Sequence, residues 1–208
     1  YRNSVYSNTI TASGGDGYGV YFFNIVYNNS FYSNTIKTSG INGYGVLLDL
    51  TAYENSVYSN NITTSGSDGY GVYLSRTAYS NSVYSNTITT SNSSAYGVLL
   101  DTTAYKNSFY NNTITTNNTK SYGIFLNNSA YNNTLYDNNI TTKNTTGSYG
   151  IYLLNNVNNN TFYRNRISSL AAGIVVNGSR QTASQTTRFN TFTNDTIVPC
   201  TAGCADNY

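Results

Sequence analysis

The sequence predicts an all-β fold, a right-handed parallel β-helix (solenoid) of about eight turns of 26 residues, with three short strands per turn. The first observation is a tandem repeat, because the segment from Asn3 to Ile10 recurs at steps of 26 residues, then of 27 and 30. The second is that the apolar residues of each repeat are mostly β-branched or aromatic, as in strands. The third is that Asn, Gly and Ser clusters separate these short apolar runs, as turns separate strands.

Five apolar columns define the expected interior. They begin at Val5, Ile10, Val20, Phe22 and Val26, and each continues at the same place in later repeats. Stacked strands lie about 4.8 Å apart, so the side chains of one column contact one another. No single turn buries its own apolar side, and stability is therefore a sum over neighbouring turns.

Two further columns, one of glycine and one of asparagine, are expected to fix the backbone conformation of the turns. Gly19 has an equivalent in every repeat through Gly173, which indicates either a positive φ or a close backbone approach. An Asn column between the first two apolar columns is expected to tolerate left-handed backbone and to form amide hydrogen bonds along the axis. Its members are Asn8, Asn34, Asn60, Asn86, Asn112, Asn138 and Asn165.

Composition limits the possible partners. Only 9% of the residues are charged, the net charge is +2, and the ten Lys and Arg residues are mostly scattered. The sequence therefore predicts no nucleic-acid partner. No apolar run approaches the length that spans a bilayer, so no membrane insertion is predicted within this segment.

With these residues identified, the sequence resembles the Asn-rich parallel β-helix repeats of NosD-like and carbohydrate-binding β-helix proteins. The resemblance is carried by Asn3-Ser-Val-Tyr-Ser-Asn-Thr-Ile10 and Tyr18-Gly-Val-Tyr-Phe22, and it covers residues 1 to 198. It implies a β-helix of a periplasmic protein, a polysaccharide enzyme or a large archaeal or bacterial surface protein. The chain has no His and no Met, which argues against copper, and no cofactor is predicted.

The acidic residues are the candidates for a catalytic role. Asp49 and Asp101 share a column two turns apart, about 9.6 Å by strand spacing, and Asp16 and Asp68 do the same. That separation barely reaches the range of inverting glycosidases. We expect Asp49 and Asp101 to be solvated and Asp16 and Asp68 to be turn residues, and we predict no catalytic or metal-binding residue.

Two outward columns are candidate interfaces or glycan-stacking surfaces. The first is a tyrosine ladder: Tyr6, Tyr32, Tyr58, Tyr84, Tyr110, Tyr136 and Tyr163. The second is an apolar stripe between the third and fourth core columns: Tyr21, Leu47, Tyr73, Leu99, Phe125, Tyr152 and Val175. The ladder is explained either by stacking that stabilises the solenoid or by a lateral or glycan-binding surface. The stripe indicates burial against another subunit, another domain or the chain's own loops.

Sequons for N-glycosylation are frequent, although an Asn-, Ser- and Thr-rich composition alone produces many of them. The acceptor residues are Asn28, Asn61, Asn92, Asn111, Asn117, Asn127, Asn132, Asn139, Asn144, Asn159, Asn177 and Asn194. Glycosylation is feasible there in a secreted protein.

The two ends differ. Residues 1–198 form the predicted β-helix, and residues 199–208 form a C-terminal cap in which Cys200 and Cys204 are expected to pair in a disulfide. Tyr1 enters in phase with the repeat, so the first turn is expected either to follow further turns or to pair with another subunit.

Together these features predict an extracellular or cell-surface structural protein of a filament, stalk or surface-layer assembly, with self-association or neighbouring domains as partners. The alternative is a glycan-binding module that uses the tyrosine ladders, and a third possibility is a polysaccharide lyase or hydrolase.

Overall fold

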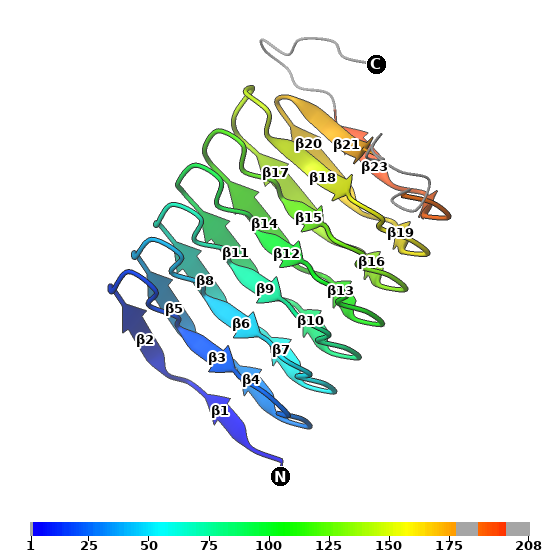
Figure 1. Ribbon diagram of the computed structural model, residues 1–208. Helices are drawn as coiled ribbons and strands as arrows, with labels where there is room; N and C mark the ends of the chain where they lie inside the picture. Colours follow the sequence, from blue (N-terminus) through cyan, green and yellow to red (C-terminus); the bar gives the residue numbers. More distant parts are fainter. Residues whose placement is uncertain (1, 178–186, 199–208) are drawn as a thin grey trace.

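The chain forms a parallel β-helix in the computed structural model, which describes residues 2–177 and 187–198. Successive turns stack along one axis, with the N-terminus at one end and the C-terminal strands at the other (Figure 1). Every strand pairs in parallel with its equivalent in the next turn, and the register joins equivalent repeat positions such as Val57 and Val83. All the named elements in the described ranges are strands.

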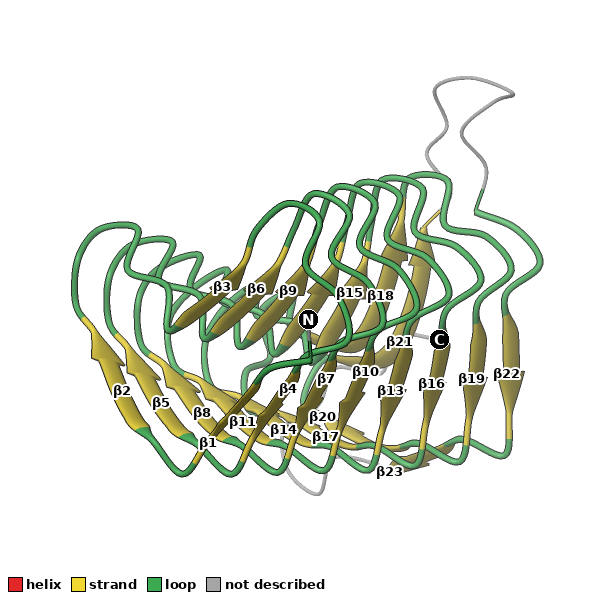
Figure 2. Ribbon diagram, turned by 90° about the horizontal axis from the view of Figure 1, so that it is seen from below, coloured by secondary structure: helices red, strands yellow, loops and turns green. Residues whose placement is uncertain are grey.

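Three sheets form the walls of the β-helix, and Figure 2 shows their strands side by side. The first sheet contains β1 (Ser4–Tyr6), β4 (Ser30–Tyr32), β7 (Ser56–Tyr58), β10 (Ser82–Tyr84), β13 (Ser108–Tyr110), β16 (Thr134–Tyr136), β19 (Thr161–Tyr163) and β22 (Thr191–Thr193). The second contains β2 (Thr9–Ala12), β5 (Thr35–Thr38), β8 (Asn61–Thr64), β11 (Thr87–Thr90), β14 (Thr113–Thr116), β17 (Asn139–Thr142), β20 (Arg166–Ser169) and β23 (Thr196–Val198). The third contains β3 (Val20–Phe22), β6 (Val46–Leu48), β9 (Val72–Leu74), β12 (Val98–Leu100), β15 (Ile124–Leu126), β18 (Tyr149–Leu154) and β21 (Ala172–Asn177).

The predicted fold class is therefore confirmed, with a small difference in the number of turns. The first two sheets have eight strands and the third has seven. The described residues thus make seven complete turns and the first two strands of another, where the repeat predicts about eight turns.

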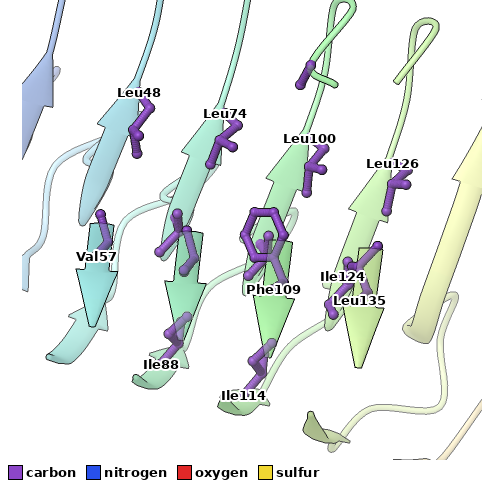
Figure 3. Packing of buried hydrophobic residues seen from close by; sticks show 14 of the residues in the cluster. Leu48, Val57, Leu74, Ile88, Leu100, Phe109, Ile114, Ile124, Leu126 and Leu135 are labelled. Atoms are coloured by element: carbon purple, nitrogen blue, oxygen red, sulfur yellow. The ribbon is translucent and has the colours of Figure 1, made fainter. Parts of the chain in front are cut away.

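The core lies between the three sheets and follows the predicted columns. Leu48, Leu74, Leu100 and Leu126 succeed one another along the third sheet and face the core residues of the other two (Figure 3). The core side chains of the inner turns are fully buried, whereas the core positions Val5 and Ile197 in the outermost turns are about half exposed. Burial thus depends on a turn having a neighbour on each side, as expected for a stacked repeat.

The glycine column exists because the backbone passes very close to the next turn. A Cβ added at Gly97 would lie 2.2 Å from Cγ2 of Ile114 and 2.6 Å from the carbonyl oxygen of Gly123. Its φ is not in the left-handed region, and among the described glycines only Gly147 has a positive φ. Close approach, rather than positive φ, is therefore the reason for this column.

Two asparagine ladders run along the axis at the two ends of the first sheet. In the predicted column, Asn60 accepts hydrogen bonds at Oδ1 from N and Nδ2 of Asn34, both at 3.0 Å. Its own Nδ2 donates to Oδ1 of Asn86 and to the Phe31 carbonyl, again at 3.0 Å. The same arrangement repeats along this ladder, which ends where Asp195 accepts from Asn165.

The second ladder was not predicted, although it has the same period. Its members hydrogen-bond in the same way from Asn3 through Asn190: Asn3, Asn29, Asn55, Asn81, Asn107, Asn133, Asn160 and Asn190. The sequence predicts left-handed backbone at the asparagines of the first ladder. In the structure the positive φ belongs instead to the residue directly before each of these asparagines, such as Ser33 or Ser59. The ladder residues serve hydrogen bonding rather than the turn conformation.

No helix in the described part of the chain is long and apolar enough to cross a membrane. The predicted cap at 199–208, including the expected Cys200–Cys204 disulfide, lies outside the described residues.

Candidate functional site

Three tyrosine ladders line the outside of the β-helix. In the ladder from Tyr6 to Tyr163, neighbouring ring centroids lie 4.8–5.0 Å apart, and neighbouring rings are within 11° of parallel. The ladder from Tyr27 to Tyr131 has spacings of 4.9–5.1 Å, and that from Tyr18 to Tyr149 has 4.9–5.4 Å. The stacking that the sequence predicts for the first ladder is thus present in all three.

This stacking limits what the ladders can bind. Each inner ring has a neighbour over both faces, so the ladder offers ring edges and hydroxyl groups to the solvent. At the end of the first ladder, the Arg164 guanidinium lies 4.8 Å from the ring centroid of Tyr163 and is held 2.7 Å from Asp137. A sugar that stacks on an aromatic face finds these faces covered, so the geometry disfavours the ladders as glycan-stacking surfaces. Whether they form a lateral interface stays a prediction.

The apolar stripe is largely covered by the chain itself. Leu47, Leu99 and Phe125 are 4%, 5% and 7% exposed, whereas Tyr21 at the end of the stripe is 41% exposed. The cover includes the tyrosines of the Tyr18–Tyr149 ladder, which contact the stripe edge to face. Tyr44 meets Tyr73 at 5.2 Å and 86°, and Tyr96 meets Phe125 at 5.1 Å and 78°. Little apolar surface therefore remains for the predicted interface, which stays a prediction.

A cleft of about 370 Å³ lies beside this cover. It lies over Leu47, beside the third sheet, and is open to the solvent. Its lining residues are Tyr18, Tyr21, Tyr44, Leu47, Asp49, Tyr73, Ser75, Arg76 and Thr102. The cleft thus combines aromatic rings with one ion pair and several hydroxyl groups.

The ion pair in the cleft corrects the expectation that Asp49 is solvated. The side chain of Asp49 is 1% exposed, and Arg76 from the next turn binds both of its oxygens, with Nε 2.8 Å from Oδ1. The Tyr21 hydroxyl donates to Oδ2 at 3.0 Å. The hydrogen bond with Asp49 raises the pKa of Arg76, and burial followed by the bond to Asp49 raises the pKa of Tyr21. Asp49 stays buried because these donors replace the water that a carboxylate requires.

Asp101 occupies the equivalent position two turns later without an equivalent cation. The Tyr73 hydroxyl lies 3.4 Å from its Oδ2, and its buried Oδ1 has no hydrogen-bond partner among the described residues. Asn128 stands one turn on, at the repeat position that Arg76 holds relative to Asp49. The pairing of Asp49 with Arg76 could have been suspected from their separation of one repeat plus one residue.

The sequon residues all lie in the described part of the chain, and none of them is buried. Asn61, Asn111, Asn117, Asn132, Asn139, Asn159, Asn177 and Asn194 are exposed. Asn28, Asn92, Asn127 and Asn144 are partly exposed. Glycan attachment at these residues remains a prediction.

The fold and the outer surface define a parallel β-helix protein built from Asn-rich tandem repeats. The sequence model of the family described as periplasmic copper-binding protein (NosD) matches residues 38–198, and the chain belongs to this family. No curated protein sequence matches it.

Among solved structures, the mannuronan C-5 epimerase AlgE4 A-module of Azotobacter vinelandii is similar to this chain. The TM-score is 0.50 and the sequence identity 12%, with 93% of this chain and 76% of that module covered. At this identity the likeness shows the fold alone.

The donor atoms of this chain do not fit the copper in the family's description. Protein copper sites use imidazole, thiolate and thioether ligands, whereas the sequence has no His, no Met and two Cys. Both cysteines lie outside the described residues, and within those residues no group of three or more His, Cys, Asp or Glu side chains could hold a metal ion. We derive no copper chemistry for this chain.

Proposed function

We propose that the chain is a rigid, rod-like structural element of the cell envelope, placed in the periplasm or at the cell surface. In this role it belongs to a stalk, a filament or a surface layer. The description of its family as periplasmic supports an envelope location.

The observation that carries the proposal is the pair of unbroken asparagine ladders. Each inner ladder amide, such as that of Asn60, is bonded both to the preceding turn and to the following turn. A bend between two turns therefore has to break buried hydrogen bonds as well as strand pairing, and a buried polar group without a partner costs about 1–3 kcal/mol. Stiffness along the axis follows from the same contacts that hold the turns together.

A non-enzymatic role is part of the proposal. Both oxygens of Asp49 are engaged by Arg76, and Tyr21 adds a further donor, so this carboxylate is held as a structural partner. Release of sugar from polysaccharides, lost on Asp49→Asn or Asp101→Asn in a folded variant, would contradict this part of the proposal.

Electron microscopy of the native assembly and of the purified chain tests the structural role. We expect straight particles of constant width, and in the native material we expect them joined into longer assemblies. Isolated monomers with free ends in the native material would overturn the filament or stalk.

Limited proteolysis gives an independent measurement of rigidity. The backbone of the inner turns is bonded to both neighbours, so we expect it to resist cleavage under native conditions. Rapid cleavage between residues 30 and 170 would contradict a rigid rod.

A further inference from the structure

The cleft over Leu47 is lined by three consecutive residues of the apolar stripe. Tyr21 and Tyr73 lie two turns apart, about 9.6 Å by strand spacing, and Leu47 stands between them. At the other end of the stripe, Phe125 and Tyr152 lie in consecutive turns and stack at 5.2 Å and 10°, which closes the surface. Leu47 thus lies on the floor of the cleft, between two aromatic residues.

The recess has a fixed polar side. Asp49 holds Arg76 through Nε and Nη2, which uses two of the five N–H donors of the guanidinium. The Arg76 side chain is 52% exposed and lines the cleft, so its other donors are available at a fixed place. Ser75 and Thr102 add hydroxyl groups to the same lining. An aromatic recess with a few pre-positioned donors is typical of small-ligand sites, and its volume lies within their usual range.

The charges around the cleft select among ligands. Asp49 cancels the charge of Arg76, which leaves no net positive charge in the lining. The other lining residues are uncharged, so the cleft carries no net charge and offers an acidic ligand no unpaired cation. This disfavours uronates and phosphates and leaves neutral and amino sugars as candidates.

We propose that this cleft binds one unit of a neutral or amino-sugar glycan, with the sugar ring between Tyr21 and Tyr73, above the nearly buried Leu47. Arg76 and the cleft hydroxyl groups hydrogen-bond to the sugar hydroxyls. Tyr21 and Tyr73 meet their ring neighbours at 56–87° and are not stacked face to face, unlike the rings of the ladders. This site is separate from the structural role, which depends on the asparagine ladders.

Isothermal titration calorimetry and NMR with defined tetrasaccharides test the site. The probes are the tetramers of glucose, mannose, N-acetylglucosamine and glucosamine, together with the tetramers of mannuronate and galacturonate as acidic probes. We expect at least one neutral or amino-sugar tetramer to bind, with each uronate at least about tenfold weaker. Chemical-shift changes should centre on Tyr21, Leu47 and Tyr73.

A matched pair of variants locates the binding. Leu47→Phe fills the recess with the residue that the stripe already carries at Phe125, and it should weaken binding at least about tenfold. Leu99→Phe makes the same change in the same stripe, at a residue that does not line the cleft, and should leave the affinity within about twofold. Folding of both variants is checked by circular dichroism and thermal unfolding.

Three results would overturn the inference: no binding of any neutral or amino-sugar tetramer at about 10 mM, tighter binding of a uronate, or unchanged binding in Leu47→Phe. If Leu47→Phe does not fold, Arg76→Met replaces it, with the same expected loss of affinity. Unchanged affinity in Arg76→Met would then count against the site.

Discussion

The two kinds of corner in this β-helix satisfy buried polar groups in different ways. At the corner between the first and second sheets, the same residue, Asn, recurs in every complete turn, and each amide bonds to identical neighbours. At the corner after the third sheet, one position holds Asp49, Ser75, Asp101 and Asn127 in successive turns. There the pairing changes from an ion pair at Asp49 to a carboxylate at Asp101 whose buried Oδ1 has no hydrogen-bond partner among the described residues.

The difference shows what repetition does for a buried polar side chain. An amide both donates and accepts, so a column of identical amides satisfies itself without help from elsewhere. A carboxylate only accepts, and it needs a particular donor that the repeat does not supply automatically. The uniform corner therefore stabilises the rod, whereas the variable corner contains the cleft.

The largest expected effect comes from raising the pH. Burial raises the pKa of Tyr44, Tyr70 and Tyr122 well above the ordinary value of 10. The folded state therefore keeps protons that the unfolded state releases, so this stabilisation is complete below pH 10 and is lost as the pH rises toward the folded pKa values. Each pH unit above 10 should cost at most about 1.4 kcal/mol per such tyrosine, and less where solvent screens a partly exposed ring.

Urea unfolding between pH 8 and 12, with phenolate absorbance recorded in parallel, checks this prediction. Tyr70→Phe removes one of these ionisable groups, so the free energy of unfolding should fall less steeply with pH. A free energy of unfolding that stays constant from pH 9 to 11 would show that these rings do not lie in the half-buried ladder.

The second prediction breaks the uniform corner. Asn60→Ala removes the acceptor of the Asn34 amide groups and the donor to the Phe31 carbonyl, and these are buried. We expect a loss of about 2–4 kcal/mol in the free energy of unfolding. The matched control is Asn61→Ala at the next, exposed residue, with a loss below about 0.5 kcal/mol. Equal losses in the two variants would contradict the ladder.

The third prediction breaks the variable corner. Arg76→Met leaves the buried Asp49 carboxylate without its cation, and we expect a loss of about 1–2 kcal/mol, reduced because Arg76 is half exposed. The double variant Asp49→Asn/Arg76→Met removes the uncompensated charge and should recover part of this loss. A double variant less stable than Arg76→Met would show that the ion pair is not the reason for the effect.

The smallest expected effect transfers the ion pair to Asp101. Asn128 has a φ of 43°, as Arg76 does, so an arginine fits the same backbone there. Asn128→Arg should gain up to about 1 kcal/mol by pairing with the Asp101 carboxylate. Thermal unfolding at low and high salt separates this gain from packing, since a charge effect falls with salt.

The sequence predicts the fold well because every column stacks on itself. A residue such as Ile88 is buried by Ile62 and Ile114 of its own column, so the period alone identifies the core. The sheets, the tyrosine stacking and one asparagine ladder follow in the same way. The burial of Asp49 does not, because its column is polar but not uniform.

The candidate site depends on contacts between different columns. The Tyr18–Tyr149 ladder covers the apolar stripe, and the period does not show which two outward columns touch. The cleft at Leu47 is lined by several different columns, including the stripe, the Tyr18–Tyr149 ladder and the ion pair of Asp49 with Arg76. The second asparagine ladder, by contrast, was open to prediction, since Asn3 opens the repeat in every turn.

The asparagine ladders also give the rod an electrical direction. In each ladder the side-chain oxygen accepts from the preceding turn and the side-chain N–H donates to the following one, so the amide dipoles point the same way. Aligned amides add up, as peptide groups do in an α-helix, with the positive end here toward the C-terminal turns. The predicted ladder ends on Asp195, which accepts from N and Nδ2 of Asn165. A carboxylate cannot donate onward, and its negative charge faces the positive end of the row, so Asp195 both terminates the chain of amides and neutralises its dipole.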